Sequence, residues 1–252
     1  MSIVNKIKQN LLGEKEEKWY ANKRSFVPVG TKHKDGRYVS EDEVRNVIVE
    51  FLSPLLEKHG FQYQKSKKAF VRKTQTGCDE IGIGSYDYLH YEFDFAFSKR
   101  IDGMQKIITA INFECGFNFI NNYKEHTTIY VCYKNLTKKR IEAISYSVLK
   151  KELEKLLPLI ENEVLPYFEK LNSLEFLNQT INYPEKDPKN IFSYFSIIKN
   201  SNRCINALII AKTLNDPNYE TLLKTYMEEN PEDLISKGQL IKLDKYLKEH
   251  DI

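Results

Sequence analysis

Four acidic residues in the middle of the chain are the first candidates for catalytic chemistry. They lie in two neighbouring stretches with strand-like alternation, and they are Asp79, Glu80, Glu92 and Asp94. Carboxylates that meet on one face of a sheet can hold a divalent ion, which activates water for attack on a phosphate or carbonyl group. A metal-dependent hydrolase or nuclease is therefore one alternative for the function. The same residues are equally explained as the solvent-facing side of an amphipathic strand.

A restriction-type nuclease needs a second feature, which is an acidic residue followed two positions later by lysine on the adjacent strand. The segment Glu92-Phe93-Asp94 lacks such a lysine, and the Glu-x-Lys matches elsewhere lie in expected helices or loops. The five histidines are dispersed and show no His-x-x-x-His or His-Glu-x-x-His spacing. We therefore expect no metal site.

Motifs for nucleotide binding and for nucleophilic catalysis are also missing. Gly82-Ile83-Gly84 does not continue to the third glycine of a dinucleotide site, and the chain has no Gly-x-x-x-x-Gly-Lys loop and no Gly-x-Ser-x-Gly elbow. The four widely spaced cysteines form no Cys-x-x-Cys pair, which indicates reduced thiols. Catalytic groups converge in space rather than in sequence, so these absences lower the expectation of an enzyme without eliminating it. We predict no catalytic residues and no cofactor.

Basic residues interleaved with aromatic ones form a candidate nucleic-acid surface. The basic members of this set are Lys32, Lys34, Arg37, Lys67 and Lys68. Aromatic side chains on the same face could stack on bases while the cations contact phosphates. The net charge is only +3, from 38 basic and 35 acidic residues, so the whole molecule lacks a strong positive field. Nucleic-acid binding is a second alternative, and a solvated loop with a charged hairpin turn explains the same residues.

A run of aromatic and amide residues between two expected strands is the candidate partner-binding segment. Its members are Phe117, Phe119, Asn121, Asn122 and Tyr123. Rigid rings and adaptable amides are typical of surfaces that recognise another protein. The competing explanation is that these rings fold back and close the end of the sheet's core.

Alternation of aromatic residues is the strongest architectural signal. Tyr91, Phe93, Phe95 and Phe97 fall on every second position, so an extended strand places all four rings on one face. Similar extended segments are expected over residues 61–65, 69–74, 79–85, 91–100, 104–114 and 127–133. Turn residues between them favour an antiparallel meander with one apolar face.

Helical periodicity surrounds these strands. Ser40 and Glu43 form a capping box that predicts a helix ending at Gly60, which Pro54 should bend or interrupt. A long helical run is expected over 148–171, bent or divided by Pro158 and Pro166. Further helices are expected over about 189–199, 203–214 and 218–228, the first and last of them opened by Asp-Pro pairs.

These elements predict an α+β fold with an antiparallel sheet meander covered by helices and followed by a C-terminal helical subdomain. The expected divisions are residues 1–39 as an N-terminal helix and surface arm, 40–135 as the sheet domain, and 136–252 as the helical subdomain. The N-terminus does not resemble a secretory signal, and no window approaches the roughly 20 apolar residues of a membrane span. We expect a cytoplasmic protein that does not contact a membrane.

The helix ending in Gly60-Phe61, followed by Ala69-Phe70-Val71-Arg72 and paired strands, resembles a group of small bacterial domains of uncharacterised function. Some members of that group look like toxin-immunity proteins. The resemblance covers about residues 43–133, implies an open antiparallel sheet, and brings no catalytic residues with it. The leading hypothesis is a non-enzymatic bacterial protein-interaction module, such as an immunity-like inhibitor or a defence component. Its partner would be another protein, either a toxin or a further defence component.

Overall fold

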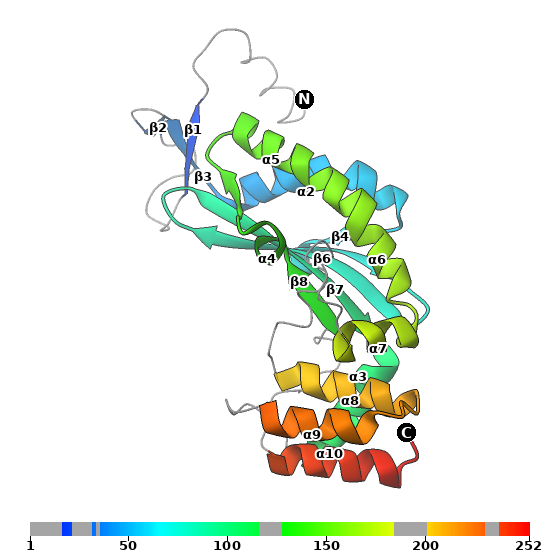
Figure 1. Ribbon diagram of the computed structural model, residues 1–252. Coiled ribbons are helices and arrows are strands. Elements are labelled where there is room, and N and C mark those ends of the chain that lie inside the picture. Colours follow the sequence, from blue (N-terminus) through cyan, green and yellow to red (C-terminus); the bar gives the residue numbers. More distant parts are fainter. Residues whose placement is uncertain (1–16, 22–31, 34–35, 116–127, 184–200, 230–236) are drawn as a thin grey trace.

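The computed structural model describes residues 17–21, 32–33, 36–115, 128–183, 201–229 and 237–252. Within these ranges the chain has the predicted α+β fold, with an antiparallel sheet, helices that cover it and further helices at the C-terminus (Figure 1).

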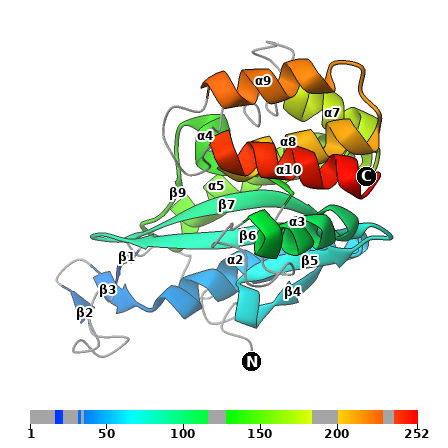
Figure 2. The ribbon, with the colours of Figure 1, turned by 90° about the horizontal axis from the view of Figure 1, so that it is seen from below.

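The main sheet is a meander in which neighbouring strands in sequence are also neighbours in space. Its strands follow the order β4 (Gln62–Gln64), β5 (Ala69–Lys73), β6 (Gly77–Asp87), β7 (Tyr91–Ile101) and β8 (Ile129–Cys132), and β9 (Ile141–Ala143) pairs with the other half of β7. Every pairing in this sheet is antiparallel. The β6–β7 hairpin is its longest element and runs along the whole sheet (Figure 2).

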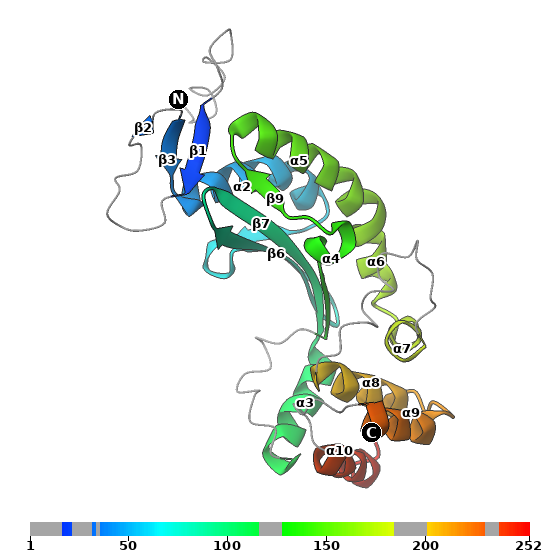
Figure 3. The ribbon, with the colours of Figure 1, turned by 60° about the vertical axis from the view of Figure 1, so that its left-hand side comes forward.

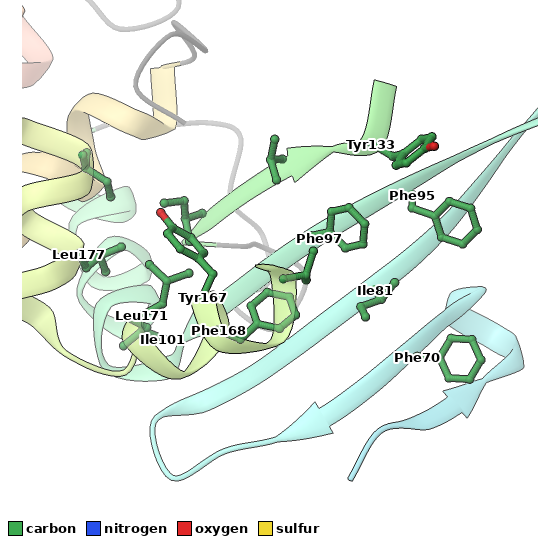
Figure 4. Close-up of a cluster of buried hydrophobic side chains, with 14 of the residues drawn as sticks. Phe70, Ile81, Phe95, Phe97, Ile101, Tyr133, Tyr167, Phe168, Leu171 and Leu177 are labelled. Carbon is green, nitrogen blue, oxygen red and sulfur yellow. The ribbon is translucent and has the colours of Figure 1, made fainter. Parts of the chain in front are cut away.

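The aromatic alternation in β7 orders the core as the sequence predicts. Phe93, Phe95 and Phe97 are fully buried on the face that helices cover, which we call the inner face. In the register of the sheet, Phe70, Ile81 and Phe97 form one row across β5, β6 and β7 (Figure 4). Burial of large aromatic side chains supplies much of the stabilisation of such a core.

Two long helices cover the inner face (Figure 1). The first, α2 (Glu41–Lys58), begins with the predicted capping box, in which Ser40 and Glu43 each bond the other's backbone N–H. It runs through Pro54 without ending, and Gly60 follows it with a φ of 82°. A positive φ is unstrained for glycine, which explains why the helix stops there.

The second covering helix corresponds to the run expected over 148–171. It consists of α5 (Tyr146–Leu159), a π-helical turn (Ile160–Val164) and α6 (Leu165–Lys170). The division that the two prolines predicted takes the form of this turn, where the Leu165 N–H donates to the carbonyl of Ile160. Proline cannot donate a helical hydrogen bond, and π turns are one way in which a helix accommodates that loss.

The N-terminal arm contains more structure than the sequence indicated. In the region expected to be a loop before Ser40, β1 (Lys18–Ala21), β3 (Gly36–Val39) and β2 (Lys32–His33) form a small sheet. The pairing of β1 with β3 is parallel. A Cβ at Gly36 would lie 2.0 Å from the carbonyl oxygen of Lys18, so only glycine allows the two strands to approach this closely.

The prediction of a strand over 104–114 is wrong. This segment is the helix α3 (Asp102–Cys115), which begins directly after β7. Its β-branched isoleucines suggested a strand, but Met104, Ile108 and Ile111 are buried at the three- and four-residue spacing of a helix. The Asp102-Gly103 pair therefore starts a helix instead of forming a hairpin turn.

Helix α3 packs with the C-terminal helices and not on the sheet's inner face. These helices are α7 (Leu174–Asn182), α8 (Ser201–Thr213), α9 (Tyr219–Glu229) and α10 (Lys237–Glu249), and α3 lies beside α8 and α10 (Figure 3). Two short elements remain, a 3-10 turn (Lys65–Lys67) and α4 (Tyr133–Thr137). The helix expected over 189–199 lies outside the described residues.

Candidate functional site

The closed end of the β6–β7 hairpin carries exposed apolar side chains. Three of the four large apolar side chains exposed in the described ranges lie there: Tyr86 is 40% exposed, Tyr88 48% and Leu89 67%. We call residues 86–90 the hairpin end. A turn between strands is normally polar, and a patch of exposed large apolar groups is typical of an interaction site.

The N-terminal arm holds the hairpin end in place. The Ala21 N–H of β1 donates to the carbonyl of Leu89 at 3.0 Å, and the Trp19 N–H donates to the carbonyl of Ile144 at 2.6 Å. The ring of Trp19 is buried against Tyr146 of α5, with ring centroids 6.4 Å apart. Strand β1 thus connects the hairpin end to the segment after β9 and to α5 (Figure 3).

A guanidinium group orients the first of these aromatic rings. The guanidinium carbon of Arg140 lies 3.6 Å from the ring centroid of Tyr86, and its Nη1 lies 3.2 Å from Oε2 of Glu92. Both charged side chains are partly buried. A cation held against a ring face by a carboxylate restricts the rotamers of all three side chains, so less entropy is lost when a partner binds.

The sequence itself contains a signal for this site that no catalytic or binding motif includes. Tyr86-Asp87-Tyr88-Leu89 places three large apolar residues between two extended segments, at positions where turn formers are expected. Arg140 had no such signal, because its proximity to Tyr86 depends on the pairing of β9 with β7.

Asp79, the first of the acidic candidates, lies on the inner face within a row of charges. In the register of the sheet Arg72, Asp79 and Lys99 are directly opposite one another on β5, β6 and β7. Asp79 Oδ1 lies 2.7 Å from Lys99 Nζ, and Asp79 Oδ2 lies 2.7 Å from Arg72 Nη2. Arg72 Nη2 also reaches Glu169 of α6 at 2.7 Å, while Lys99 Nζ lies 3.5 Å from the carbonyl oxygen of Phe168.

This row supplies a carboxylate and a lysine on adjacent strands, two of the groups that the nuclease alternative requires. The residue two positions before Lys99 is Phe97, however, so the second carboxylate of that arrangement is replaced by a buried ring. Asp79 and Lys99 are themselves fully buried. The row therefore acts as an internal ionic contact between the sheet and α6.

The other acidic candidates lie on the opposite, outer face of the sheet, and each has partners of its own. Glu80 approaches Lys67 with Nζ–Oε2 at 3.4 Å, and Glu92 contacts Arg140. Asp94 is buried instead of facing water as expected, and its Oδ1 accepts from the backbone N–H groups of Phe95 and Lys134 at 3.0 and 2.9 Å. The structure does not bring these carboxylates together with Asp79 on one face.

Within the described ranges, no group of three or more His, Cys, Asp and Glu side chains could hold a metal ion.

The described basic candidates are each engaged with a carboxylate. Arg37 contacts Glu17 at 3.2 Å and Glu43 at 3.1 Å, Lys67 contacts Glu80, and Lys68 Nζ lies 2.8 Å from Glu41 Oε1. Lys32 belongs to β2, but its side chain and all of Lys34 lie outside what the structure describes.

The candidate partner-binding segment with Phe117, Phe119, Asn121, Asn122 and Tyr123 lies outside the described residues. The site that can be built from the described part of the chain is therefore the hairpin end.

An open depression of about 670 Å³ lies between α7 and the start of α9. Its central group is Asp216, whose Oδ2 accepts from Asn178 at 2.7 Å and whose Oδ1 accepts from the Asn218 N–H at 2.9 Å. Burial alone would raise the pKa of Asp216, but hydrogen bonds from Asn178, Asn218 and Tyr183 outweigh it and lower that pKa. Because α9 begins at Tyr219, the predicted helix start at Asp216-Pro217 is confirmed. The Asp216 carboxylate accepts the Asn218 N–H at this start, so its role there is to stabilise the beginning of the helix.

Comparisons of the chain with protein-family models, with curated protein sequences and with solved structures each gave no significant match. Among the described helices, none combines the length and apolar character of a membrane span.

Proposed function

We propose that the protein is a protein-recognition module whose partner docks on the hairpin end. The observation that carries this proposal is the grouping of Tyr86, Tyr88 and Leu89, all exposed, at a hairpin end that β1 and Arg140 hold in place. Aromatic residues are enriched at the centres of protein interfaces, where a rigid ring gives contact area at a low entropic cost.

The particular role that we propose is that of a bacterial interaction protein, such as an immunity-like inhibitor or a defence component. The resemblance of the segment 43–133 to small bacterial domains supports this choice. The hairpin end lies inside that segment, on β6 and β7, so the resemblance and the exposed patch concern the same part of the chain.

The experiment is affinity purification of the full chain from its native host, compared between three forms. They are the wild type, the double variant Tyr88→Ser/Leu89→Ser, and the matched control Ile241→Ser. Ile241 is 56% exposed on α10, so its replacement removes exposed apolar surface at a distant place.

We expect one protein to be recovered in comparable amounts with the wild type and with the Ile241 variant. Recovery should fall by about tenfold or more with the double variant, since central interface side chains contribute at least that much to affinity. Circular dichroism and thermal unfolding must show that all three forms are folded. Equal recovery of every associated protein by the three forms would refute the proposal.

A further inference from the structure

Two carboxylates face each other beside the exposed rings of the hairpin end. In the register of the sheet Tyr86 is opposite Glu92, and Glu92 is opposite Glu142 of β9. Directly opposite residues of antiparallel strands share a face, so Tyr86, Glu92 and Glu142 form one row on the outer face. Like charges in this arrangement repel each other.

Cations compensate this charge only in part. Arg140 contacts Glu92 and the ring of Tyr86. Glu142 is exposed, and among the described residues it has no ion-pair partner. The described row beside Tyr86 thus offers one arginine contact for two carboxylates.

Docking on the exposed rings has a consequence for Glu142. A partner that covers Tyr86 also removes water from the adjacent row, and a carboxylate that loses water without gaining a cation is destabilised. The like charge of Glu92 directly opposite makes this loss larger. A neutral or acidic partner surface, or the phosphates of a nucleic acid, would therefore bind poorly at this place.

We propose that the partner is a basic protein surface that places a lysine or arginine between Glu92 and Glu142, next to an apolar side chain that packs on Tyr88 and Leu89. This inference rests on the proposed function and names the chemistry of its partner. The incoming cation relieves the repulsion within the row and replaces the water that docking removes.

The test uses a displayed library of random peptides, selected on the immobilised full chain and then measured individually in solution. Affinities are determined for the wild type, Glu142→Gln, Glu142→Lys and the double variant Tyr88→Ser/Leu89→Ser. The matched charge control is Glu161→Lys, because Glu161 is exposed in the π-helical turn, far from the hairpin end in sequence, and has no ion pair within the described part of the chain. Thermal unfolding verifies that each variant is folded.

We expect the selected peptides to combine Lys or Arg with an apolar residue. Their affinity should fall about tenfold or more with Glu142→Lys, less with Glu142→Gln, and not at all with Glu161→Lys. Raising the salt concentration should weaken binding to the wild type more than binding to Glu142→Gln, because the lost interaction is ionic.

Two results would overturn the inference in different ways. Peptides that need Tyr88 and Leu89 but bind Glu142→Lys as tightly as the wild type would refute the basic partner and leave the proposed function intact. Failure to select any peptide that needs Tyr88 and Leu89 would refute both. A single-stranded oligonucleotide that binds the wild type and is lost with the double variant would replace the protein partner by a nucleic acid and would likewise refute both.

Discussion

Asp79 and Lys99 form an ion pair inside the protein, with Oδ1 and Nζ 2.7 Å apart and both side chains fully buried. They are directly opposite each other on β6 and β7, and Arg72 completes the row from β5. Two residues along the same face, the equivalent row consists of the apolar side chains Phe70, Ile81 and Phe97. The inner face thus changes from apolar to ionic within one step along the strands.

The variant Lys99→Met should reduce the free energy of unfolding by about 3 kcal/mol, because it leaves a buried carboxylate with one partner fewer. The double variant Asp79→Leu/Lys99→Met should recover most of that loss, because Arg72 keeps its contact with Glu169. Urea denaturation followed by circular dichroism measures both values.

The matched control for this prediction is Lys67→Met. Lys67 lies in the 3-10 turn before β5 and contacts Glu80 of β6 at 3.4 Å, but its side chain is exposed. Exposed pairs contribute about 0–1 kcal/mol, so this variant should change the unfolding free energy little. A loss for Lys99→Met no larger than that for Lys67→Met would contradict an ionic contribution from the buried pair.

The sequence predicted the fold where local signals agreed with the tertiary contacts. The alternation of rings was sufficient to predict the strand β7, and the capping box of Ser40 was sufficient to predict the start of α2. Each signal encodes its structure within a few residues. The prediction for the segment of α3 was wrong because isoleucines favour strands locally. Only the packing of this segment against α8 and α10 decides in favour of a helix. The parallel pairing of β1 with β3 could not be predicted, since it joins strands across a long connection.

The candidate site was less predictable than the fold. The alternation of side chains along a strand shows which residues share a face, and it placed Glu92 and Asp94 on the face that does not carry the rings of β7. Alternation does not show which residues of other elements these side chains contact. Asp94 became a buried acceptor for the Lys134 N–H because α4 begins beside it. Arg140 contacts Tyr86 only through the pairing of β9 with β7, and the sequence did not predict the strand β9.

The variant Ser40→Ala should destabilise the protein by about 1 kcal/mol, since it removes one side of the capping box at the start of α2. The Glu43 N–H, in the first turn of α2, then loses its acceptor. Ser53→Ala, inside the same helix, serves as the control and should change stability by much less. Equal effects of the two substitutions on the midpoint of urea unfolding would contradict a capping role for Ser40.

Cys78 and Cys132 should react slowly with iodoacetamide in the native protein. Burial raises the pKa of the Cys78 thiol, and burial together with the nearby Asp94 raises that of Cys132. Only the thiolate reacts, so both should be alkylated about tenfold or more slowly than in the urea-unfolded chain. Mass spectrometry of the alkylated peptides measures each rate. Native rates as fast as the unfolded ones would contradict the prediction.

A cluster of charges lies near the start of α2, at the edge of β6 that is left where this strand extends beyond its pairing with β5. Arg45 is buried, donates to the carbonyl of Ile83 and pairs with Glu41, and Lys68 Nζ lies 2.8 Å from the same carboxylate. Burial alone would raise the pKa of Glu41, but hydrogen bonds from Lys68, Arg45 and Ser85 outweigh it and lower the pKa to about 2. Charged side chains at a strand edge also discourage pairing with other chains.

This lowered pKa gives the stability a defined dependence on pH. Because the pKa of Glu41 is lower in the folded chain than in the unfolded one, its ionised form stabilises the protein above about pH 5. The contribution is lost as the pH falls towards 2, where the folded carboxyl group also binds a proton.

Glu41→Gln should therefore be less stable than the wild type at neutral pH, and the difference should shrink steadily below about pH 5. Urea unfolding at several values of pH measures this difference, with Glu161→Gln as an exposed control that should show none. A difference that stays constant from neutral to acidic pH would mean that the charge of Glu41 does not hold the edge.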